Sequence, residues 1–344
     1  MVGVRHKAGI IGCGNIFPMH AMSLKNLDFV DIVAVCDVKE DRAAAAAKKY
    51  NCKYYTDYKK MIDEAGIDVV HICTPHYLHA PMAIYAANAK KHVITEKPMS
   101  IEHHDAVEMV NMAKANNVTF GVIFQNHYNP GSQLIKSTLE SGDLGKILSA
   151  RVIVTWNRSD EYYSKSDWKG TWDKEGGGVV IDQAIHTLDL MRWFIDSEID
   201  YVDAQISNRA HDIIQVEDSA EGVIKFKNNV LAAFFAVNYY AYDAPVEIEL
   251  YCEKGTAKMY GAKATIQFKD GKILKKDIDE NEGVFYGLGV KSYWGVSHIK
   301  QIKNFYMSII SGQTPEIDGE YGLKTQEMIS AIYNSGKTSK RIYF

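Results

Sequence analysis

Short apolar runs alternate with helix-forming segments along the first part of the chain, and this alternation restricts the possible folds more than any other feature of the sequence. The apolar runs are residues 8–13, 30–36, 69–73, 92–95 and 119–124, with amphipathic segments such as 41–50 and 80–89 between them. Strands that are apolar throughout are typical of sheets covered on both faces. The pattern therefore predicts an α/β fold in which a parallel sheet lies between layers of helices.

The rhythm changes near residue 125, where we place a domain boundary. The following segments indicate helices at 131–141 and 179–195, strands at 147–156, 216–225, 230–237 and 246–251, and two late helices at 296–310 and 321–334. Alternating apolar and polar residues favour a mostly antiparallel sheet with one covered face. The length of 344 residues suits two domains. We therefore predict a nucleotide-binding domain over 1–125 and an α+β domain over 126–344, which binds substrate and forms oligomers.

Composition excludes several classes of protein. An apolar fraction of 47% and a charged fraction of 24% are those of a globular protein rather than a disordered one. With a net charge of -4, the chain lacks the excess of basic residues that binds a phosphate backbone, so we expect no nucleic-acid partner. The five cysteines are irregularly spaced and mostly lie in apolar runs, which indicates free thiols in a reducing compartment. With neither a signal segment nor a membrane-spanning run, we expect a cytoplasmic protein without a membrane partner.

A glycine turn follows the first predicted strand. Gly12 and Gly14 permit a tight turn and close approach of a dinucleotide pyrophosphate to the helix N-terminus, with Asn15 and Ile16 in the same turn. Phe17 stands where the full fingerprint has a third glycine. Asp37 ends the second strand, 23 residues beyond Gly14, where a carboxylate accepts hydrogen bonds from the adenosine ribose and repels a 2′-phosphate. The pattern favours NAD over NADP, although a strand-to-helix turn and a strand-end carboxylate are the simpler alternatives.

Further polar residues follow the later strands of the first half, at the edge where open α/β sheets bind ligands. We predict that cofactor contacts come from the ends of the strands over 69–73, 92–95 and 119–124: Thr74, Pro75, His76, His79, Glu96, Lys97 and Gln125. His76 and His79 line the crevice or cap the next helix. Lys97 points into the crevice over the nicotinamide. In the second half, Asp182 and His186 are four residues apart on one face of a predicted helix. They are either a catalytic pair or a pair of surface residues.

The chain resembles the glucose-fructose oxidoreductase/inositol dehydrogenase/rhizopine catabolism (Gfo/Idh/MocA) family along nearly its whole length. The motifs that carry the resemblance are the Gly-x-Gly turn, Thr74-Pro75, Glu96-Lys97-Pro98 and the glycine-rich entry to Asp182-x-x-x-His186. Tyr162-Tyr163, Trp168-Lys169-Gly170-Thr171-Trp172 and Gly176–Gly178 resemble a branch that oxidises position 3 of sugars and nucleotide-sugar uronic acids. The sequence departs from this branch at His127, where many relatives have arginine, which could help to bind an anionic substrate. Arg158 is an alternative source of that positive charge.

The resemblance implies an NAD-dependent dehydrogenase that acts on a secondary alcohol of a sugar, sugar derivative or cyclic polyol. Lys97 touches the reacting oxygen, His186 is the acid/base, and Asp182 orients substrate hydroxyls. Glu96 lies beside the nicotinamide ribose or is a buried structural carboxylate. The residues assigned to the substrate are Lys97, His127, Arg158, Tyr163, Trp168, Trp172, Asp182 and His186. The three aromatic residues form a platform for a sugar ring or pack in the core.

Three other expectations complete the sequence-based interpretation. We expect no catalytic metal, because the histidine pairs His76/His79 and His103/His104 lack the spacing of a complete zinc site. An NAD-using glycosidase or lyase and a non-catalytic NAD-binding regulator stay open as alternatives. Finally, an open sheet face carrying Phe234, Phe235 and Val237 predicts a homodimer or homotetramer assembled through the C-terminal sheet.

Overall fold

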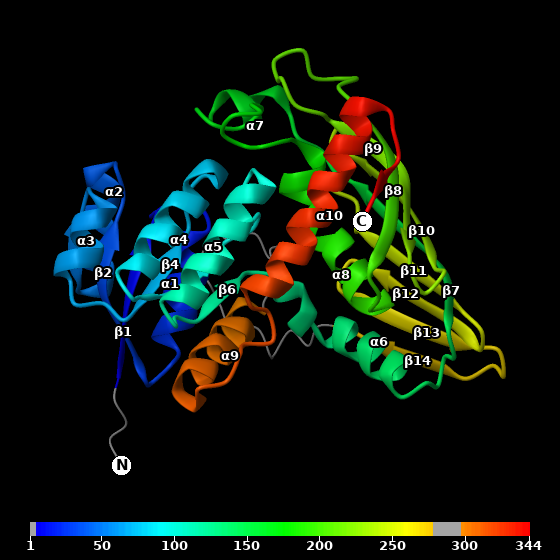
Figure 1. Cartoon of the computed structure of the whole chain (residues 1–344), viewed down its shortest axis with the longest axis horizontal. Helices are drawn as coiled ribbons and strands as arrows, with labels where there is room; N and C mark the ends of the chain where they lie inside the picture. The colour runs from blue at the N-terminus through cyan, green and yellow to red at the C-terminus, as the bar shows by residue number, and fades with distance from the viewer. Residues whose placement is uncertain (1–4, 278–296) are drawn as a thin grey trace. The chain divides into compact units, whose positions relative to one another are not determined.

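The computed structural model describes residues 5–277 and 297–344 (Figure 1). Its residues form two compact units, each described here by itself. Within the described ranges, no helix has the length and apolar character that crossing a membrane requires.

The first unit is built on a six-stranded, all-parallel sheet in the order β3-β2-β1-β4-β5-β6. This is the strand order of a dinucleotide-binding Rossmann fold, and it confirms the predicted fold of the first half. Its elements are β1 (His6–Ile11), α1 (Phe17–Lys25), β2 (Val30–Cys36), α2 (Glu40–Tyr50), β3 (Lys53–Tyr55), α3 (Tyr58–Glu64), β4 (Val69–Ile72), η1 (His76–Leu78), α4 (His79–Asn88), β5 (His92–Thr95), α5 (His103–Ala115), β6 (Phe120–Val122) and α9 (His298–Ser311). The short helix η2 (Gln125–Tyr128) lies at the junction with the second unit.

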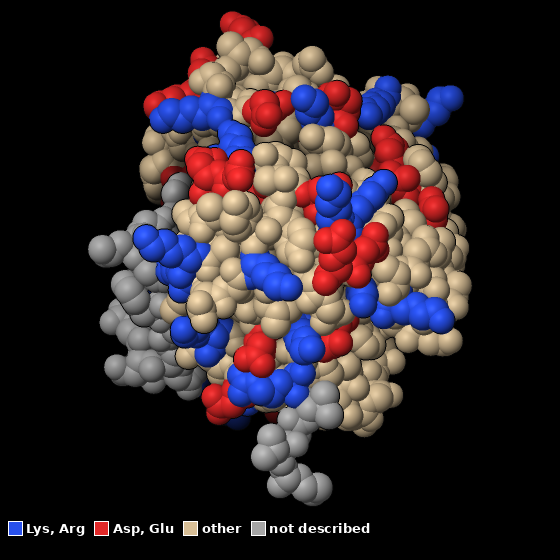
Figure 2. Space-filling view, turned by 90° about the vertical axis from the view of Figure 1, so that its left-hand side faces the viewer, with Lys and Arg blue, Asp and Glu red and all other residues tan. Residues whose placement is uncertain are grey.

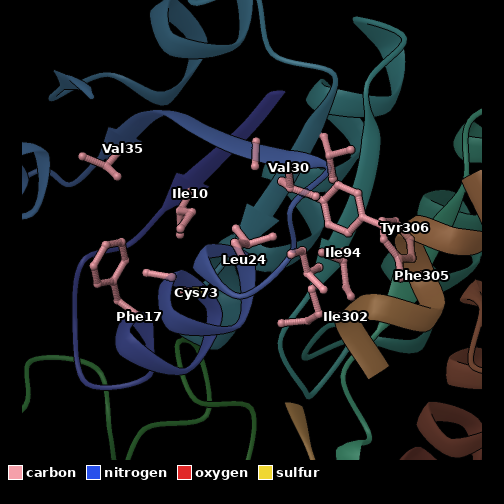
Figure 3. Packing of buried hydrophobic residues seen from close by; sticks show 14 of the residues in the cluster. Ile10, Phe17, Leu24, Val30, Val35, Cys73, Ile94, Ile302, Phe305 and Tyr306 are labelled. Atoms are coloured by element: carbon pink, nitrogen blue, oxygen red, sulfur yellow. The ribbon is translucent and has the colours of Figure 1, made fainter. Parts of the chain in front are cut away.

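Helix α9 corrects the predicted domain limits, because residues 297–324 belong to the first unit rather than to a continuous domain over 126–344. The reason is packing. Figure 3 shows Ile302, Phe305 and Tyr306 of α9 beside Ile94 and Leu24 of the sheet and α1, and all five are buried in one apolar cluster. The apolar stripe of α9 completes the core on this side of the sheet.

The second unit is built on a nine-stranded sheet in the order β14-β13-β12-β11-β7-β10-β9-β8-β15, antiparallel except where β10 pairs with β7. Its elements are α6 (Pro130–Glu140), β7 (Ile147–Thr155), α7 (Asp160–Ser164), η3 (Val179–Ala184), α8 (Ile185–Ile195), β8 (Ile199–Ser207), β9 (Ser219–Phe226), β10 (Leu231–Val237), β11 (Glu247–Cys252), β12 (Gly255–Tyr260), β13 (Lys263–Phe268), β14 (Ile273–Lys276), the greater part of α10 (Gly319–Thr338) and β15 (Ile342–Tyr343). The mostly antiparallel sheet agrees with the prediction.

One face of this sheet is covered by helices and the other is open, as Figure 1 shows for α6 and α8 beside β7 and β11–β14. The period of two along β10 decides which side chains lie on the open face. Phe235 is 39% exposed, whereas Phe234 and Val237 are 4% and 2% exposed. The prediction that all three face outward is therefore wrong for Phe234 and Val237, because Phe234 alternates with Phe235 and Val237 is buried where β10 ends.

The predicted helix over 179–195 consists of two parts. The first, η3, is a π-helix that contains Asp182, and the second, α8, begins at Ile185 and contains His186. A π-helical turn is wider than an α-helical turn, and such turns are frequent at functional sites. Asp182 and His186 are therefore not related by the regular α-helical spacing that the prediction assumed.

Candidate functional site

The glycine turn after β1 has the geometry that a pyrophosphate site needs. Gly12 has φ +93, and a Cβ there would lie 2.4 Å from the carbonyl oxygen of Cys73. Among the described residues, a Cβ on Gly14 would meet nothing within 4 Å on its side of the turn. Asn15 is exposed and Ile16 half-buried, directly before α1. Phe17, in place of the third glycine, packs edge-on against Tyr50 in the core.

The Asp37 carboxylate is held beside this turn. One oxygen accepts a hydrogen bond from the backbone N–H of Cys13 and the other from that of Lys39, both at 2.9 Å. Each carboxylate oxygen accepts more than one hydrogen bond, so ribose hydroxyls can still bind. The residues around the turn therefore fit an NAD adenosine, with Asp37 as the ribose acceptor.

The loops that follow β4 and β5 are joined by His79. Its Nδ1 lies 2.7 Å from the carbonyl oxygen of Pro98, and its Nε2 lies 2.9 Å from that of Thr74. His79 is fully buried, and burial lowers the pKa of its imidazole. His76 is buried beside it, with the two rings 5.9 Å apart. A neutral imidazole has one N–H, so His79 donates to one of these two carbonyl oxygens and contacts the other, between the loop carrying Thr74 and the loop carrying Lys97.

Lys97 directly follows the buried carboxylate of Glu96 at the end of β5. The Lys97 backbone N–H donates to Glu96 Oε2 at 3.3 Å. Glu96 Oε1 lies 2.9 Å from His20 Nε2 and 3.4 Å from His298 Nε2. Burial raises the pKa of the Glu96 carboxyl, but the hydrogen bonds from His20 and His298 outweigh that effect and bring the pKa well below its ordinary value. These contacts favour a buried positioning role for Glu96 over contact with the nicotinamide ribose.

His20, Glu96 and His298 are also a group with ligand-type atoms within 4.8 Å of one another. The direct hydrogen bond between His20 and Glu96 accounts for this proximity without an ion, because a proton on His20 Nε2 already joins the two groups. The absence of a catalytic metal stays a prediction.

In the second unit, Asp182 is the centre of a group of donors. Its Oδ2 atom accepts hydrogen bonds from Lys169 Nζ at 2.8 Å, Tyr162 Oη at 2.8 Å and Gln183 Nε2 at 2.7 Å. The side chains of Lys169 and Asp182 are only 14% and 11% exposed. Three donors stabilise an ionised carboxylate. Asp182 is thus suited to orienting ligands rather than to taking up a proton.

Lys169 holds a second carboxylate besides Asp182. Its Nζ lies 3.4 Å from Glu175 Oε1, and it also lies 4.4 Å and 4.7 Å from the ring centres of Trp168 and Tyr162. Burial raises the pKa of the Glu175 carboxyl above its ordinary value, although Lys169 opposes this effect. Burial also lowers the pKa of Lys169, but Asp182, Tyr162 and Glu175 outweigh it and raise that pKa. Lys169 and Glu175 were absent from the predicted site.

The glycine triplet allows η3 to approach β9 and α10 closely. A Cβ on Gly177 would lie 2.0 Å from Tyr333 Oη, and one on Gly178 would lie 1.9 Å from the carbonyl oxygen of Glu217. The Glu217 carboxylate accepts hydrogen bonds from the N–H groups of Gly178 and Val180 and from Tyr333 Oη. These contacts fix the start of the segment that carries Asp182 and, one turn later, the half-buried His186.

Two residues assigned to the substrate have structural partners instead. His127 is buried, its Nε2 lies 2.6 Å from Asp189 Oδ2, and its ring lies 4.2 Å from that of Trp193. Arg158 is buried, and its guanidinium donates to Asp243 Oδ1 at 2.8 Å. The Asp189 carboxylate is buried and requires a partner, which His127 supplies, whereas the Asp243 side chain that Arg158 contacts is 32% exposed. The substrate contacts of His127 and Arg158 stay predictions.

The predicted aromatic platform is divided. Tyr163 is buried with Ile214 and Val216, and its hydroxyl accepts a hydrogen bond from Asn238. Its ring therefore packs in the core, which was the simpler alternative. Trp172 is half-buried, and its Nε1 donates to the carbonyl oxygen of Gln215. Trp168 is also half-buried, beside Lys169, so a role for Trp168 and Trp172 in sugar binding stays a prediction.

Of the residues missed by sequence reasoning, His71 had a detectable signal. Lys169 lies between two tryptophans, and Glu175 directly precedes the glycine triplet. His71 interrupts an otherwise apolar strand, Val69–Ile72. A polar residue in an apolar run has to find a partner when it is buried, so His71 was a candidate for a polar network, whereas Lys169 and Glu175 have charged neighbours in sequence and carry no such signal. The partner of His71, Tyr306, lies 235 residues away in sequence.

The surface charge shows no segregation by sign on the face in Figure 2, where Lys and Arg side chains are interspersed with Asp and Glu. Such a face offers no basic stripe of the kind that follows a phosphate backbone. The exclusion of nucleic acid as a partner remains a prediction from composition.

Comparison with known proteins agrees with these features. Residues 6–124 match the oxidoreductase family with an NAD-binding Rossmann fold, and residues 132–258 match the GFO/IDH/MocA C-terminal domain. Myo-inositol 2-dehydrogenase of Thermotoga maritima is 26% identical over 324 residues, which are 92% of this chain and 92% of the relative. Levoglucosan dehydrogenase of Pseudarthrobacter phenanthrenivorans is 33% identical over 174 residues, 50% of this chain and 44% of that relative.

A solved structure is similar over the whole chain. The WlbA dehydrogenase from Chromobacterium violaceum, in complex with NADH and UDP-GlcNAcA, has a TM-score of 0.88 and 28% sequence identity, covering 100% of this chain and 97% of that one. The two matched domains, the strand order and the glycine turn all agree: the chain belongs to the Gfo/Idh/MocA family of NAD-binding oxidoreductases.

Proposed function

We propose that this protein is an NAD-dependent dehydrogenase that oxidises a secondary alcohol of an uncharged sugar, sugar derivative or cyclic polyol. The observation that carries the proposal is the placement of Lys97. It follows β5 at the carboxyl edge of the parallel sheet, the same edge at which the Gly12 turn and Asp37 follow β1 and β2. Ligands bind at this edge in open α/β sheets.

The chemistry needs a proton acceptor and a group that stabilises developing negative charge. NAD, when bound, supplies the hydride acceptor. The Lys97 ammonium stabilises the alkoxide as the hydroxyl proton leaves, and His186 takes up that proton, since its ordinary pKa of about 6.5 suits transfer at neutral pH. Asp182 orients substrate hydroxyls as an ionised acceptor held by Lys169 and Tyr162.

An uncharged substrate is favoured by the engagement of two cations. Arg158 faces Asp243, and Lys169 faces both Asp182 and Glu175. An anionic sugar would have to compete with these carboxylates for each cation. A cyclic polyol or glycoside needs only hydrogen-bond partners. The similar proteins include a myo-inositol 2-dehydrogenase and a WlbA dehydrogenase whose structure holds NADH and UDP-GlcNAcA.

The test is a spectrophotometric screen for NADH formation at alkaline pH. The panel contains myo-inositol, levoglucosan, a methyl glucoside, glucose 6-phosphate and UDP-GlcNAcA. We expect an uncharged member to give the highest kcat/KM. A clear preference for UDP-GlcNAcA would contradict the uncharged substrate. Cleavage of the glycoside without net NADH would instead indicate the glycosidase or lyase reaction.

Lys97→Ala tests the assignment of the lysine. We expect turnover to fall by about 10²–10⁴, the usual size for a positioned proton-transfer or charge-stabilising group. The Kd for NAD, measured by fluorescence titration, should stay within a few fold. Lys114→Ala is the matched control, because Lys114 is an exposed lysine of the same unit that pairs with Glu320. Near-normal turnover in Lys97→Ala would exclude the proposed role of Lys97.

Assembly and location complete the proposal. Phe235, Leu231 and Tyr251 are exposed large side chains of adjacent parts of the C-terminal sheet, and a second subunit covering them would form a homodimer or homotetramer. All five cysteines, which lie in the described ranges, are free thiols, as expected for the cytoplasm.

A further inference from the structure

A buried chain of hydrogen bonds runs through the first unit and ends at Glu96. Tyr306 Oη of α9 lies 3.0 Å from His71 Nε2 in β4. His71 Nδ1 lies 2.9 Å from His20 Nδ1 in α1, and His20 Nε2 lies 2.9 Å from Glu96 Oε1. Four segments that are distant in sequence thus supply one chain. Figure 3 shows Tyr306 at the inner face of α9.

All four side chains are excluded from solvent. Tyr306, His71 and His20 are 0% exposed and Glu96 is 6% exposed. Apolar residues would fill this space at lower cost in desolvation, because each buried polar group must be fully paired. The sequence of donors and acceptors therefore calls for a function beyond packing.

The direction of every hydrogen bond follows from the groups present. Burial lowers the pKa of both imidazoles, so His20 and His71 are neutral near pH 7. A neutral imidazole has one N–H and one acceptor nitrogen. The Glu96 carboxylate only accepts, so His20 carries its proton on Nε2 and must accept at Nδ1. His71 then donates from Nδ1 and accepts at Nε2, where the Tyr306 hydroxyl donates.

We propose that this chain, from Tyr306 through His71 and His20 to Glu96, is a positioning device for Lys97. It keeps Glu96 ionised and fixed in place, and Glu96 in turn holds the Lys97 backbone N–H. On the other side of Lys97, His79 holds the carbonyl oxygen of Pro98. The lysine is thereby anchored at both neighbouring residues, and its side chain starts from a rigid backbone, as a catalytic group requires. The inference rests on the proposed function, because Lys97 is the group whose placement matters.

The other titratable groups around Glu96 do not replace His20 in this chain. His298 of α9 approaches the same oxygen, Oε1, at the longer distance of 3.4 Å. His79 of α4 has both ring nitrogens against the two carbonyl oxygens described above and does not face Glu96 with a free donor. Burial and the nearby Glu96 raise the pKa of the Cys73 thiol well above its ordinary value, so Cys73 stays protonated. Lys97 contributes its backbone N–H. Only His20 links Glu96 to a second buried histidine within the described residues.

A matched pair of substitutions at His20 separates positioning from packing. The amide of glutamine reaches the place of Nε2 and can donate to Glu96, whereas the shorter asparagine amide reaches the place of Nδ1. We expect His20→Gln to keep kcat within about threefold. In His20→Asn, kcat should fall at least tenfold near pH 6.5 and recover at higher pH. Without its donor, the buried Glu96 carboxyl has a raised pKa, so it is protonated near pH 6.5 and ionises only as the pH increases. The Kd for NAD should be unchanged in both.

Tyr306→Phe tests the far end of the chain. Without the tyrosine hydroxyl, His71 no longer has a donor at Nε2, and the order of donors toward Glu96 is weakened. We expect the low-pH side of the kcat–pH profile of Tyr306→Phe to move to higher pH, as in His20→Asn, but by a smaller amount. Tyr50→Phe is the control, since the Tyr50 hydroxyl is buried without a hydrogen-bond partner in the part of the chain that the structure describes. A profile that moves equally in Tyr50→Phe, or in neither Tyr306→Phe nor His20→Asn, would overturn the proposal.

A measurement without turnover keeps this inference separate from the proposed function. Nitrogen NMR of [15N]histidine-labelled protein at pH 7, assigned with His20→Gln and His71→Gln, should show the His20 proton on Nε2 and the His71 proton on Nδ1. The opposite tautomers, a protonated His20, or one equivalent of zinc in the purified protein would each overturn the chain, because each changes the donor that faces Glu96. If Lys97→Ala is active but the tautomers are as expected, the proposed function fails and the chain stands.

Discussion

The buried ion pair of Lys169 and Asp182 makes a strong prediction about stability and pH. In Lys169→Met the ammonium is replaced by an apolar group of similar length. Asp182 Oδ2 loses the charged one of its three donors, at 2.8 Å, and Glu175 loses its cation at 3.4 Å. Breaking one partner of a buried pair typically costs about 3–5 kcal/mol, because it leaves a buried charge without compensation.

The cost has an upper limit that depends on pH. The folded variant can always neutralise Asp182 by taking up a proton. The ordinary pKa of aspartate is about 3.9, so protonation at pH 7 costs about 4 kcal/mol, at about 1.4 kcal/mol per pH unit. The limit falls to about 1.5 kcal/mol at pH 5. In the variant the folded carboxyl has a raised pKa relative to the unfolded chain, so its contribution to stability is lost as pH rises.

The assay is urea unfolding of Lys169→Met and the unmodified protein at pH 5, 6, 7 and 8. We expect the difference in free energy of unfolding to grow with pH by at most about 1.4 kcal/mol per unit, from about 1–1.5 kcal/mol at pH 5 to about 3–4 kcal/mol at pH 7. Lys169→Arg, which keeps the cation, should lose less. The double variant Lys169→Met with Asp182→Asn should be more stable at pH 8 than Lys169→Met alone. A difference that is flat between pH 5 and 8 would refute the reasoning.

Three further predictions follow from the site and the sheet. Replacing Asp37 by serine together with Val38 by arginine should shift the ratio of NADPH to NADH affinity by about tenfold or more toward NADPH, because repulsion is removed and a cation is offered; a fluorescence titration with unchanged ratio would contradict the role of Asp37. His186→Ala should flatten the limb of the kcat profile near neutral pH. If that limb is lost in Glu175→Gln and kept in His186→Ala, the titrating group is Glu175, whose pKa burial raises. Phe235→Glu should lower the mass measured by light scattering without changing the circular dichroism spectrum, and an unchanged mass would exclude the open sheet face as the interface.

The parts of the fold that follow local patterns were predictable. The strands of the parallel sheet are apolar runs with β-branched residues, and the Gly12 turn and Asp37 lie at fixed distances along one βαβ unit. The antiparallel second sheet was predictable from alternation, since the burial of β10 alternates from Leu231 to Ala236. In each case the physical cause is contained within a short segment of sequence.

The features that were missed depend on contacts between distant segments. The return of α9 to the first unit rests on residues such as Tyr306, whose partner His71 lies 235 residues earlier in the chain. The outward direction assigned to Phe234 failed because periodicity gives two faces and does not say which is covered. His127 was assigned to the substrate by position alone, and its partner Asp189 lies 62 residues later.

In both units, a carboxylate near a candidate catalytic residue accepts hydrogen bonds from fixed donors. Glu96, beside Lys97, has His20 as its donor, and Asp182, one turn before His186, has Lys169 and Tyr162. In both places donors stabilise the ionised carboxylate. Such charges need no rearrangement when a substrate alcohol starts to lose its proton, because their orientation and protonation are already set by folding. These buried donors and carboxylates then serve catalysis rather than stability, since replacing such groups by apolar residues of equal volume often costs no stability.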